Sequence, residues 1–127
     1  MIGAKILLVD DDMNILAILK YRLELQGYEI ITATNASAAE RQVAAEHPNL
    51  VLLDVMMPGQ DGVTVCRRLK HDQQPGDLPR VIILSAVSDQ RTVDAAFAAG
   101  ASGWINKPFN FTTLISEVDH YLTDLPA

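Results

Sequence analysis

The segment KILLVDDD at residues 5–12 joins a short, largely apolar run to three consecutive aspartates. Comparable runs occur at residues 50–54 (LVLLD) and 81–85 (VIILS), and weaker ones occur at residues 28–32 and 102–106. All five have the length of a β-strand. Their apolar residues mostly follow one another instead of alternating with polar ones, which is typical of strands covered on both faces in a parallel sheet.

Segments with helical spacing separate these runs. Ile15, Leu16, Leu19 and Leu23 recur every three or four residues and are followed by Gly27, a typical residue after a helix end. Further helices are expected over residues 36–46 and 63–70, from Ser88 or Asp89 to Gly100, and from Asn110 or Thr112 to Leu122. Strand and helix therefore alternate five times, which predicts an α/β domain built on an open, doubly wound parallel sheet.

Composition restricts the class of protein. The 127 residues, 49% of them hydrophobic and 20% charged, suit one globular domain. A net charge of −6 disfavours direct binding to nucleic acid or to an anionic membrane. The single cysteine, Cys66, excludes an intramolecular disulfide. Because no apolar stretch is long enough for a membrane span, and aspartates interrupt the first apolar run, we expect a cytoplasmic protein.

Carboxylates follow two of the predicted strands. Asp10, Asp11 and Asp12 end the first run and Asp54 ends the third, and ligands of doubly wound sheets bind at this edge. If the two strands are neighbours, two carboxylates repel each other by about 4 kcal/mol at an intermediate dielectric, and a cation such as Mg²⁺ compensates. The plainer alternative is that these aspartates cap a helix and solvate a loop, and we expect that role for Asp12.

Two further polar residues end the next two predicted strands, Ser85 the fourth and Lys107 the fifth. Taken singly, Ser85 is a typical turn hydroxyl and Lys107 a typical surface charge. Their coincidence with the aspartates indicates a joint site. Lys107 precedes Pro108, in a turn that is compatible with a cis peptide bond.

Four motifs resemble the receiver domain of two-component response regulators, the CheY-like family. They are ILLVDDD at residues 6–12, LDVMMPGQDG at 53–62, LSA at 84–86 and GASGWINKPF at 100–109. The resemblance covers essentially the whole chain. It implies a flavodoxin-like (βα)5 sheet with strand order 2-1-3-4-5, and one receiver domain over residues 1–127 with no output domain in this chain.

The resemblance also implies a chemistry. Asp54 is similar to the phosphoacceptor that takes a phosphoryl group from a histidine kinase or a histidine phosphotransfer protein. Asp10, Asp11, Asp54 and the backbone carbonyl of Met56 resemble the Mg²⁺ ligands, and Lys107 resembles the residue that stabilises the transferred group. Such a chain is a phosphoacceptor switch that catalyses its own phosphorylation, and not an enzyme with external turnover.

Ser85 and Trp104 resemble the switch residues of the family, although most relatives have tyrosine or phenylalanine in place of Trp104. The implied output is binding of an unknown downstream target to the surface formed by the fourth helix, fifth strand and fifth helix, by a monomer or weak homodimer. Met56 and Val87 occupy the positions that flank the path of hydrolytic water. Because both are apolar, we expect slow autodephosphorylation.

Two other classes of protein share parts of this pattern. A Mg²⁺-dependent phosphohydrolase with an aspartyl intermediate places its nucleophile after the first strand, in an Asp-x-Asp pattern, and covers the substrate with a cap; neither feature is evident. An electron-transfer flavodoxin has hydroxyl and glycine residues around the flavin phosphate, where this chain has acids.

Overall fold

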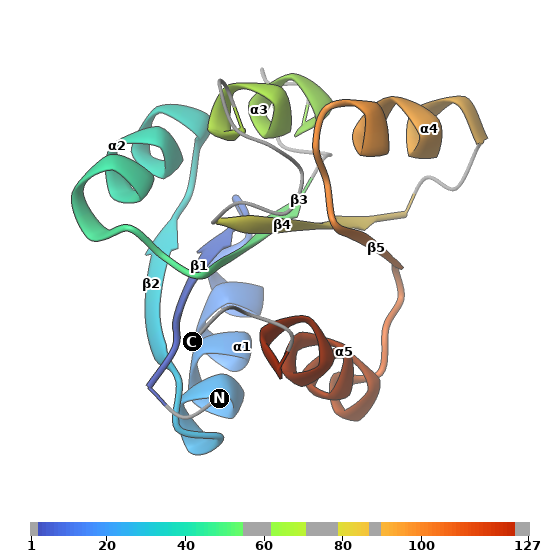
Figure 1. Cartoon of the computed structure of the whole chain (residues 1–127). Helices are drawn as coiled ribbons and strands as arrows, with labels where there is room; N and C mark the ends of the chain where they lie inside the picture. The colour runs from blue at the N-terminus through green and yellow to red at the C-terminus, as the bar shows by residue number, and fades with distance from the viewer. Residues whose placement is uncertain (1–2, 55–61, 71–78, 87–89, 124–127) are drawn as a thin grey trace.

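The computed structural model describes residues 3–54, 62–70, 79–86 and 90–123. Within them strands and helices alternate along the chain (Figure 1). The elements are β1 (Lys5–Val9), α1 (Met13–Leu25), β2 (Glu29–Ala33), α2 (Ala36–Glu46), β3 (Leu50–Asp54), α3 (Gly62–Leu69), β4 (Arg80–Ser85), α4 (Gln90–Ala98), β5 (Gly103–Asn106) and α5 (Phe111–Thr123). The predicted fivefold alternation is confirmed.

The strands form one parallel sheet in the order β2-β1-β3-β4-β5, so the flavodoxin-like topology is confirmed. Val9 of β1 is level with Leu53 of β3, which places the residues that follow, Asp10 and Asp54, side by side at one edge of the sheet. The hydrogen-bonding register therefore brings together two carboxylates that are separated by more than forty positions in the sequence.

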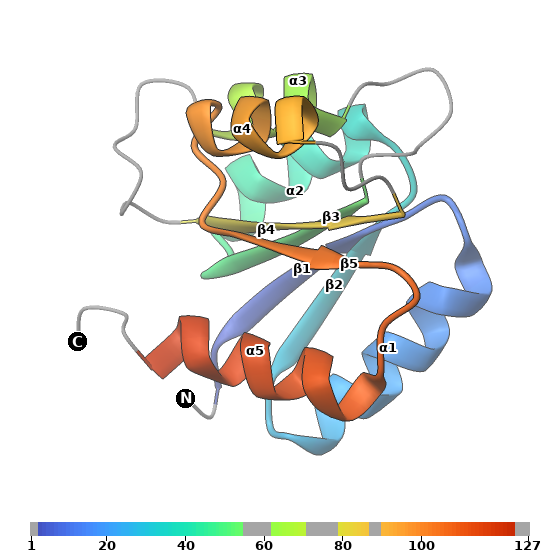
Figure 2. The same ribbon diagram turned by 90° about the vertical axis from the view of Figure 1, so that its right-hand side faces the viewer.

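Helices cover both faces of the sheet. Figures 1 and 2 show α1 and α5 on one face and α2, α3 and α4 on the other. Along β1, Ile6 and Leu8 pack with the core under α1 and α5, whereas Leu7 and Val9 pack with the core under the other three helices. Successive strand residues point to opposite faces, so burial of both faces requires an apolar residue at every position. The unbroken apolar runs follow from this.

Side chains and glycines define several helix ends. The Asp12 carboxylate accepts the backbone N–H groups of Asn14 and Ile15 at the start of α1, which confirms its predicted capping role. Gly27 follows the same helix with a φ of 95°, a conformation that glycine adopts without a steric penalty. The helix start expected at Ser88 or Asp89 lies outside the described residues.

The last helix begins after Asn110. The Oδ1 atom of Asn110 accepts the backbone N–H groups of Thr112 and Thr113, so Asn110 and not Thr112 is the capping residue. The strand before it starts one residue later than expected, because Gly103 and not Ser102 begins β5. These differences of one or two residues leave the loop from Lys107 to Asn110 at the edge of the sheet where the aspartates gather.

Candidate functional site

Three carboxylates meet where β1 and β3 end. One oxygen each from Asp10, Asp11 and Asp54 lies within 4.8 Å of the others. Asp10 and Asp54 are buried, while Asp11 is exposed to solvent. At that separation two carboxylate charges repel each other by roughly 3 kcal/mol at an effective dielectric of about 20. The predicted cluster is thus present, and its charge needs compensation.

The surroundings of Asp10 disfavour its ionised form. Its Oδ1 atom accepts the backbone N–H of Asp12 at 2.9 Å, whereas its buried Oδ2 atom has no hydrogen-bond partner among the described residues. Burial raises the pKa of Asp10 to about 6, and the charge of Asp54 acts in the same direction. The Asp12 N–H and the Lys107 ammonium lower the pKa without offsetting the burial.

Lys107 supplies a positive charge at the same edge of the sheet, from the end of β5, two strands away from β3. Its Nζ atom lies 2.9 Å from Asp54 Oδ2 and 3.8 Å from Asp10 Oδ2. The backbone N–H of Lys107 donates to the carbonyl of Ser85 at 2.7 Å, and its peptide bond to Pro108 is cis. Lys107 is therefore a half-buried partner of Asp54 and not the solvated surface charge that a lone lysine suggests.

The donor set fits a divalent cation. Three carboxylates share one edge, and one ammonium cannot neutralise all of them when they are ionised. The buried Asp10 Oδ2 has no hydrogen bond among the described residues and is available as a ligand. Oxygen donors of this kind suit Mg²⁺. The residues present therefore fit the metal that the sequence suggested.

Ser85 lies in β4 and Trp104 in β5, and neither belongs to the carboxylate cluster. Ser85 ends β4 and is fully buried, one residue beyond the pairing of Asp54 with Leu84. Trp104 lies in β5, packs against the core under α2, α3 and α4, and donates its Nε1 hydrogen to Asn106 Oδ1 at 2.9 Å. The other two predicted site residues, Met56 and Val87, lie outside the described residues.

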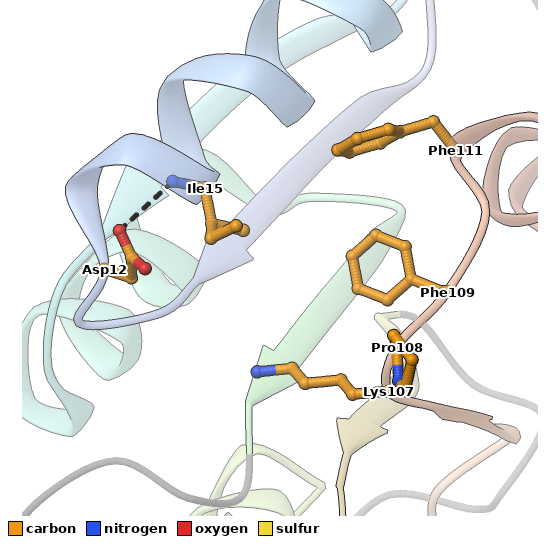
Figure 3. A pocket seen from close by; sticks show the side chains of 6 residues that line it. All are labelled: Asp12, Ile15, Lys107, Pro108, Phe109 and Phe111. Carbon is orange, nitrogen blue, oxygen red and sulfur yellow. Dashed lines mark hydrogen bonds between the residues drawn. The ribbon is translucent and has the colours of Figure 1, made fainter.

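A cavity of about 350 Å³ adjoins Lys107 between the start of α1 and the loop after β5. In Figure 3 the rings of Phe109 and Phe111 point toward Ile15 across this space, and the two rings pack edge to face at 5.6 Å. Its lining consists of Asp12, Ile15, Lys107, Pro108, Phe109 and Phe111. Neither phenylalanine was predicted as a site residue, although two aromatic residues within four positions of the site lysine, Phe109 in the loop and Phe111 at the start of α5, were a signal in the sequence.

The family model of the response regulator receiver domain matches residues 6–119. This chain is a response regulator receiver domain. Receiver domains are signalling switches, and this receiver domain places the expected aspartates, lysine and serine at one edge of its sheet. The predicted family is confirmed by the match and by the strand order.

Individual relatives agree with this assignment. The receiver domain is 36% identical over 118 residues to the phosphate regulon transcriptional regulatory protein PhoB of Pseudomonas aeruginosa, which covers 93% of this chain and 51% of that protein. It thus spans about half the length of the curated relatives it matches. A CheY-like receiver domain protein from Methanospirillum hungatei shares 29% identity and a TM-score of 0.88, with 97% of this chain and 96% of that one covered.

A third relative was solved in an activated form. The BeF3-activated N-terminal receiver domain of Klebsiella pneumoniae RstA superposes on this receiver domain with a TM-score of 0.82 and 29% identity, covering 93% of this chain and 97% of that one.

Proposed function

We propose that Asp54 accepts a phosphoryl group from the phosphohistidine of a histidine kinase or a histidine phosphotransfer protein. The observation that carries this proposal is the Lys107 ammonium 2.9 Å from Asp54 Oδ2, inside a three-carboxylate cluster. A buried carboxylate beside a fixed cation is oriented as a nucleophile. Family membership supports the same role.

The proposed transfer needs no separate base. A carboxylate oxygen of Asp54 forms the new O–P bond while the P–N bond to the donor histidine breaks, and the electron pair of that bond returns to the imidazole. Lys107 contacts Asp54, and in the proposed transfer its ammonium also contacts the incoming phosphoryl oxygens and stabilises their charge. In this proposal Asp10, Asp11, Asp54 and the backbone carbonyl of Met56 would hold Mg²⁺, which would supply further neutralisation of that charge.

The switch residues of the proposal are Ser85 and Trp104. Ser85 is buried at the end of β4, one residue beyond the strand position level with Asp54, and in this proposal its hydroxyl responds to the phosphoryl group. Trp104 lies two residues before the end of β5. We propose that a downstream partner reads their rearrangement on the surface of α4, β5 and α5.

Phosphoramidate with Mg²⁺, followed by intact mass spectrometry, tests the proposal without a partner protein. The expected product carries one phosphoryl group per chain and does not form when EDTA removes the metal. Repeated hydrolysis of a small phosphoester with no retained adduct would instead identify the chain as a phosphohydrolase.

Replacement of Lys107 by alanine separates metal binding from transfer. We expect Lys107→Ala to retain Mg²⁺ binding, because the three carboxylates remain, and to slow phosphorylation by about 100-fold, since one donor to the developing charge is lost. Calorimetric titration with Mg²⁺ and the rate of adduct formation measure the two effects. Lys107→Arg, which keeps the charge, is the matched variant. An unchanged rate in Lys107→Ala contradicts the role of the ammonium.

The phosphorylated protein is expected to lose its phosphoryl group slowly. Met56 and Val87 fall at the two sequence positions that, by resemblance to the family, flank the path of water, and their apolar side chains cannot orient a water molecule for attack. Decay of radiolabel from purified, phosphorylated protein after removal of the donor measures the rate. Loss of the label within seconds contradicts this expectation.

The wider setting of the chain is also part of the proposal. We propose a cytoplasmic chain, monomeric or weakly dimeric, that binds a protein target and neither nucleic acid nor membrane. The net charge of −6 supports the last two points. Among the described residues, none of the helices has the length and apolar character needed to cross a bilayer. Size-exclusion chromatography and DNA binding by this chain alone test these points.

A further inference from the structure

Trp104 is the one tryptophan of the sequence and makes a hydrogen bond that belongs to its own strand. Its Nε1 atom donates to Asn106 Oδ1 at 2.9 Å. Residues two apart in a strand point to the same face of the sheet. The indole and the carboxamide therefore lie on one face of β5, where the half-buried Trp104 packs against the core under α2, α3 and α4 and Asn106 is exposed to solvent.

This hydrogen bond orients the Nε1 edge of the indole ring. Trp104 packs against apolar residues of the core, and the hydrogen bond to Asn106 adds a directional contact at the Nε1 edge of the ring. Among the described residues, Asn106 Oδ1 is the acceptor of Nε1. Because Asn106 is the last residue of β5, the bond directs the Nε1 edge toward the end of the strand where Lys107 follows.

Asn106 is also next to the residues expected to rearrange at the site. It is level with Ser85 in the pairing of β4 with β5, and the adjacent backbone N–H, that of Lys107, donates to the Ser85 carbonyl. A shift of the backbone at Ser85 or Lys107 thus moves the acceptor of the Trp104 hydrogen bond. Asn106 lies between the phosphoacceptor site and the tryptophan.

We propose that Asn106 is a positioning residue that holds Trp104 in the orientation of the unphosphorylated chain. The structure shows Lys107 paired directly with Asp54, the arrangement of the unmodified aspartate, together with the Trp104–Asn106 bond. Phosphorylation repositions Ser85 and Lys107, and the indole leaves Asn106. This inference rests on the proposed function. It adds to it a residue that sets the equilibrium between the unphosphorylated and the activated conformation.

The size of the effect follows from ordinary hydrogen-bond strength. One neutral hydrogen bond biases two side-chain orientations by a factor of about 2 to 10. If the bond stabilises only the unphosphorylated state, its loss shifts the equilibrium toward the activated state by that factor. A ligand that binds the activated state then binds more tightly by the same factor.

Asn106→Ala tests the proposal with two measurements on the purified chain. Beryllofluoride with Mg²⁺ is the probe, because it mimics an aspartyl phosphate without turnover. We expect the variant to bind it about 2 to 10 times more tightly than the wild type. Before the probe is added, the tryptophan fluorescence of the variant is expected to be quenched more strongly by acrylamide, since the indole is released.

Trp104→Phe provides the matched background. It keeps an aromatic ring in β5 and removes the Nε1 donor, so Asn106→Ala should not change beryllofluoride affinity when combined with it. An equal gain in affinity in both backgrounds would mean that Asn106 acts on the strand and not through Trp104, and would overturn the proposal.

The remaining outcomes separate this inference from the proposed function. If the wild type binds beryllofluoride and Asn106→Ala shows neither tighter binding nor stronger quenching, the positioning role is overturned and the phosphoacceptor role stands. If the wild type with its aspartates intact does not bind beryllofluoride at all, the proposed function fails, and the coupling inferred from it fails with it.

Discussion

Replacing Asp54 with asparagine is expected to reduce phosphorylation from phosphoramidate to an undetectable level. The amide keeps the shape of the carboxylate but is a very poor nucleophile, so no acyl phosphate forms. It also removes the charge that pairs with Lys107 Nζ at 2.9 Å and lowers the charge of the cluster shared with Asp10 and Asp11. Intact mass after incubation with phosphoramidate and Mg²⁺ measures the loss.

Asp12→Asn is the matched control for this experiment. Asp12 belongs to the same acidic run as Asp10 and Asp11, but its carboxylate caps α1. Asparagine caps a helix about as well as aspartate does, so we expect a folded protein that forms the adduct at nearly the wild-type rate. An adduct on Asp54→Asn at the wild-type level would show that another residue is the phosphoacceptor.

Replacing Asp10 with asparagine is expected to stabilise the metal-free protein above pH 6. Burial raises the pKa of Asp10 from its ordinary value of 3.8 to about 6, which means that folding disfavours the ionised carboxylate. Each unit of difference between folded and unfolded pKa corresponds to about 1.4 kcal/mol. The penalty removed by the neutral amide is therefore about 3 kcal/mol at most, or a gain of roughly 5 to 10 °C in melting temperature.

The pH dependence of this effect has a definite sign. Below pH 3.8 the carboxyl group is protonated in both the folded and the unfolded chain, so the wild type carries no penalty. Between pH 3.8 and 6 the unfolded chain loses this proton first, and the wild type loses stability relative to Asp10→Asn. Above pH 6 the difference in free energy of unfolding between Asp10→Asn and the wild type is constant. Urea unfolding at pH 5 and pH 8 in EDTA measures the two regimes.

In the presence of Mg²⁺ we expect the wild type to be more stable than Asp10→Asn, the reverse of their order without metal. If Asp10, Asp11 and Asp54 hold Mg²⁺ as proposed, the metal would stabilise the wild type, and it would stabilise the variant less because one charged ligand is missing. Asp11→Asn is the matched control: it also removes a ligand, but Asp11 is exposed and we expect little gain in metal-free stability. Equal stability of Asp10→Asn and the wild type at pH 8 without metal contradicts the burial penalty.

The fold could be predicted because its signals are local. A strand buried on both faces needs consecutive apolar side chains, and β1, β3 and β4 each have four of them in a row, with polar residues only at their ends. Asp12 marks the start of α1 because a carboxylate accepts the free N–H groups of the first turn. These relationships involve only neighbouring residues of one segment, so they are present in the sequence before any tertiary contact forms.

The composition of the site followed from the same patterns. Asp10, Asp54, Ser85 and Lys107 each come at or just after the end of a predicted strand, and parallel strands end at a common edge. The positions at the strand ends predict that these side chains lie close together, but they give neither the distances between the side chains nor their contacts. Residue type and strand position identified the candidates, and the family resemblance assigned their roles.

Tertiary structure decided what these residues contact. The pairing of Lys107 with Asp54 joins positions 53 residues apart, and the buried Asp10 oxygen without a hydrogen bond depends on which side chains fill the space around it. The Trp104–Asn106 bond and the cavity beside Phe109 likewise depend on side-chain packing. Local periodicity determines which segments form strands and helices, whereas the register between strands and the packing of side chains set the distances on which charge, pKa and catalysis depend.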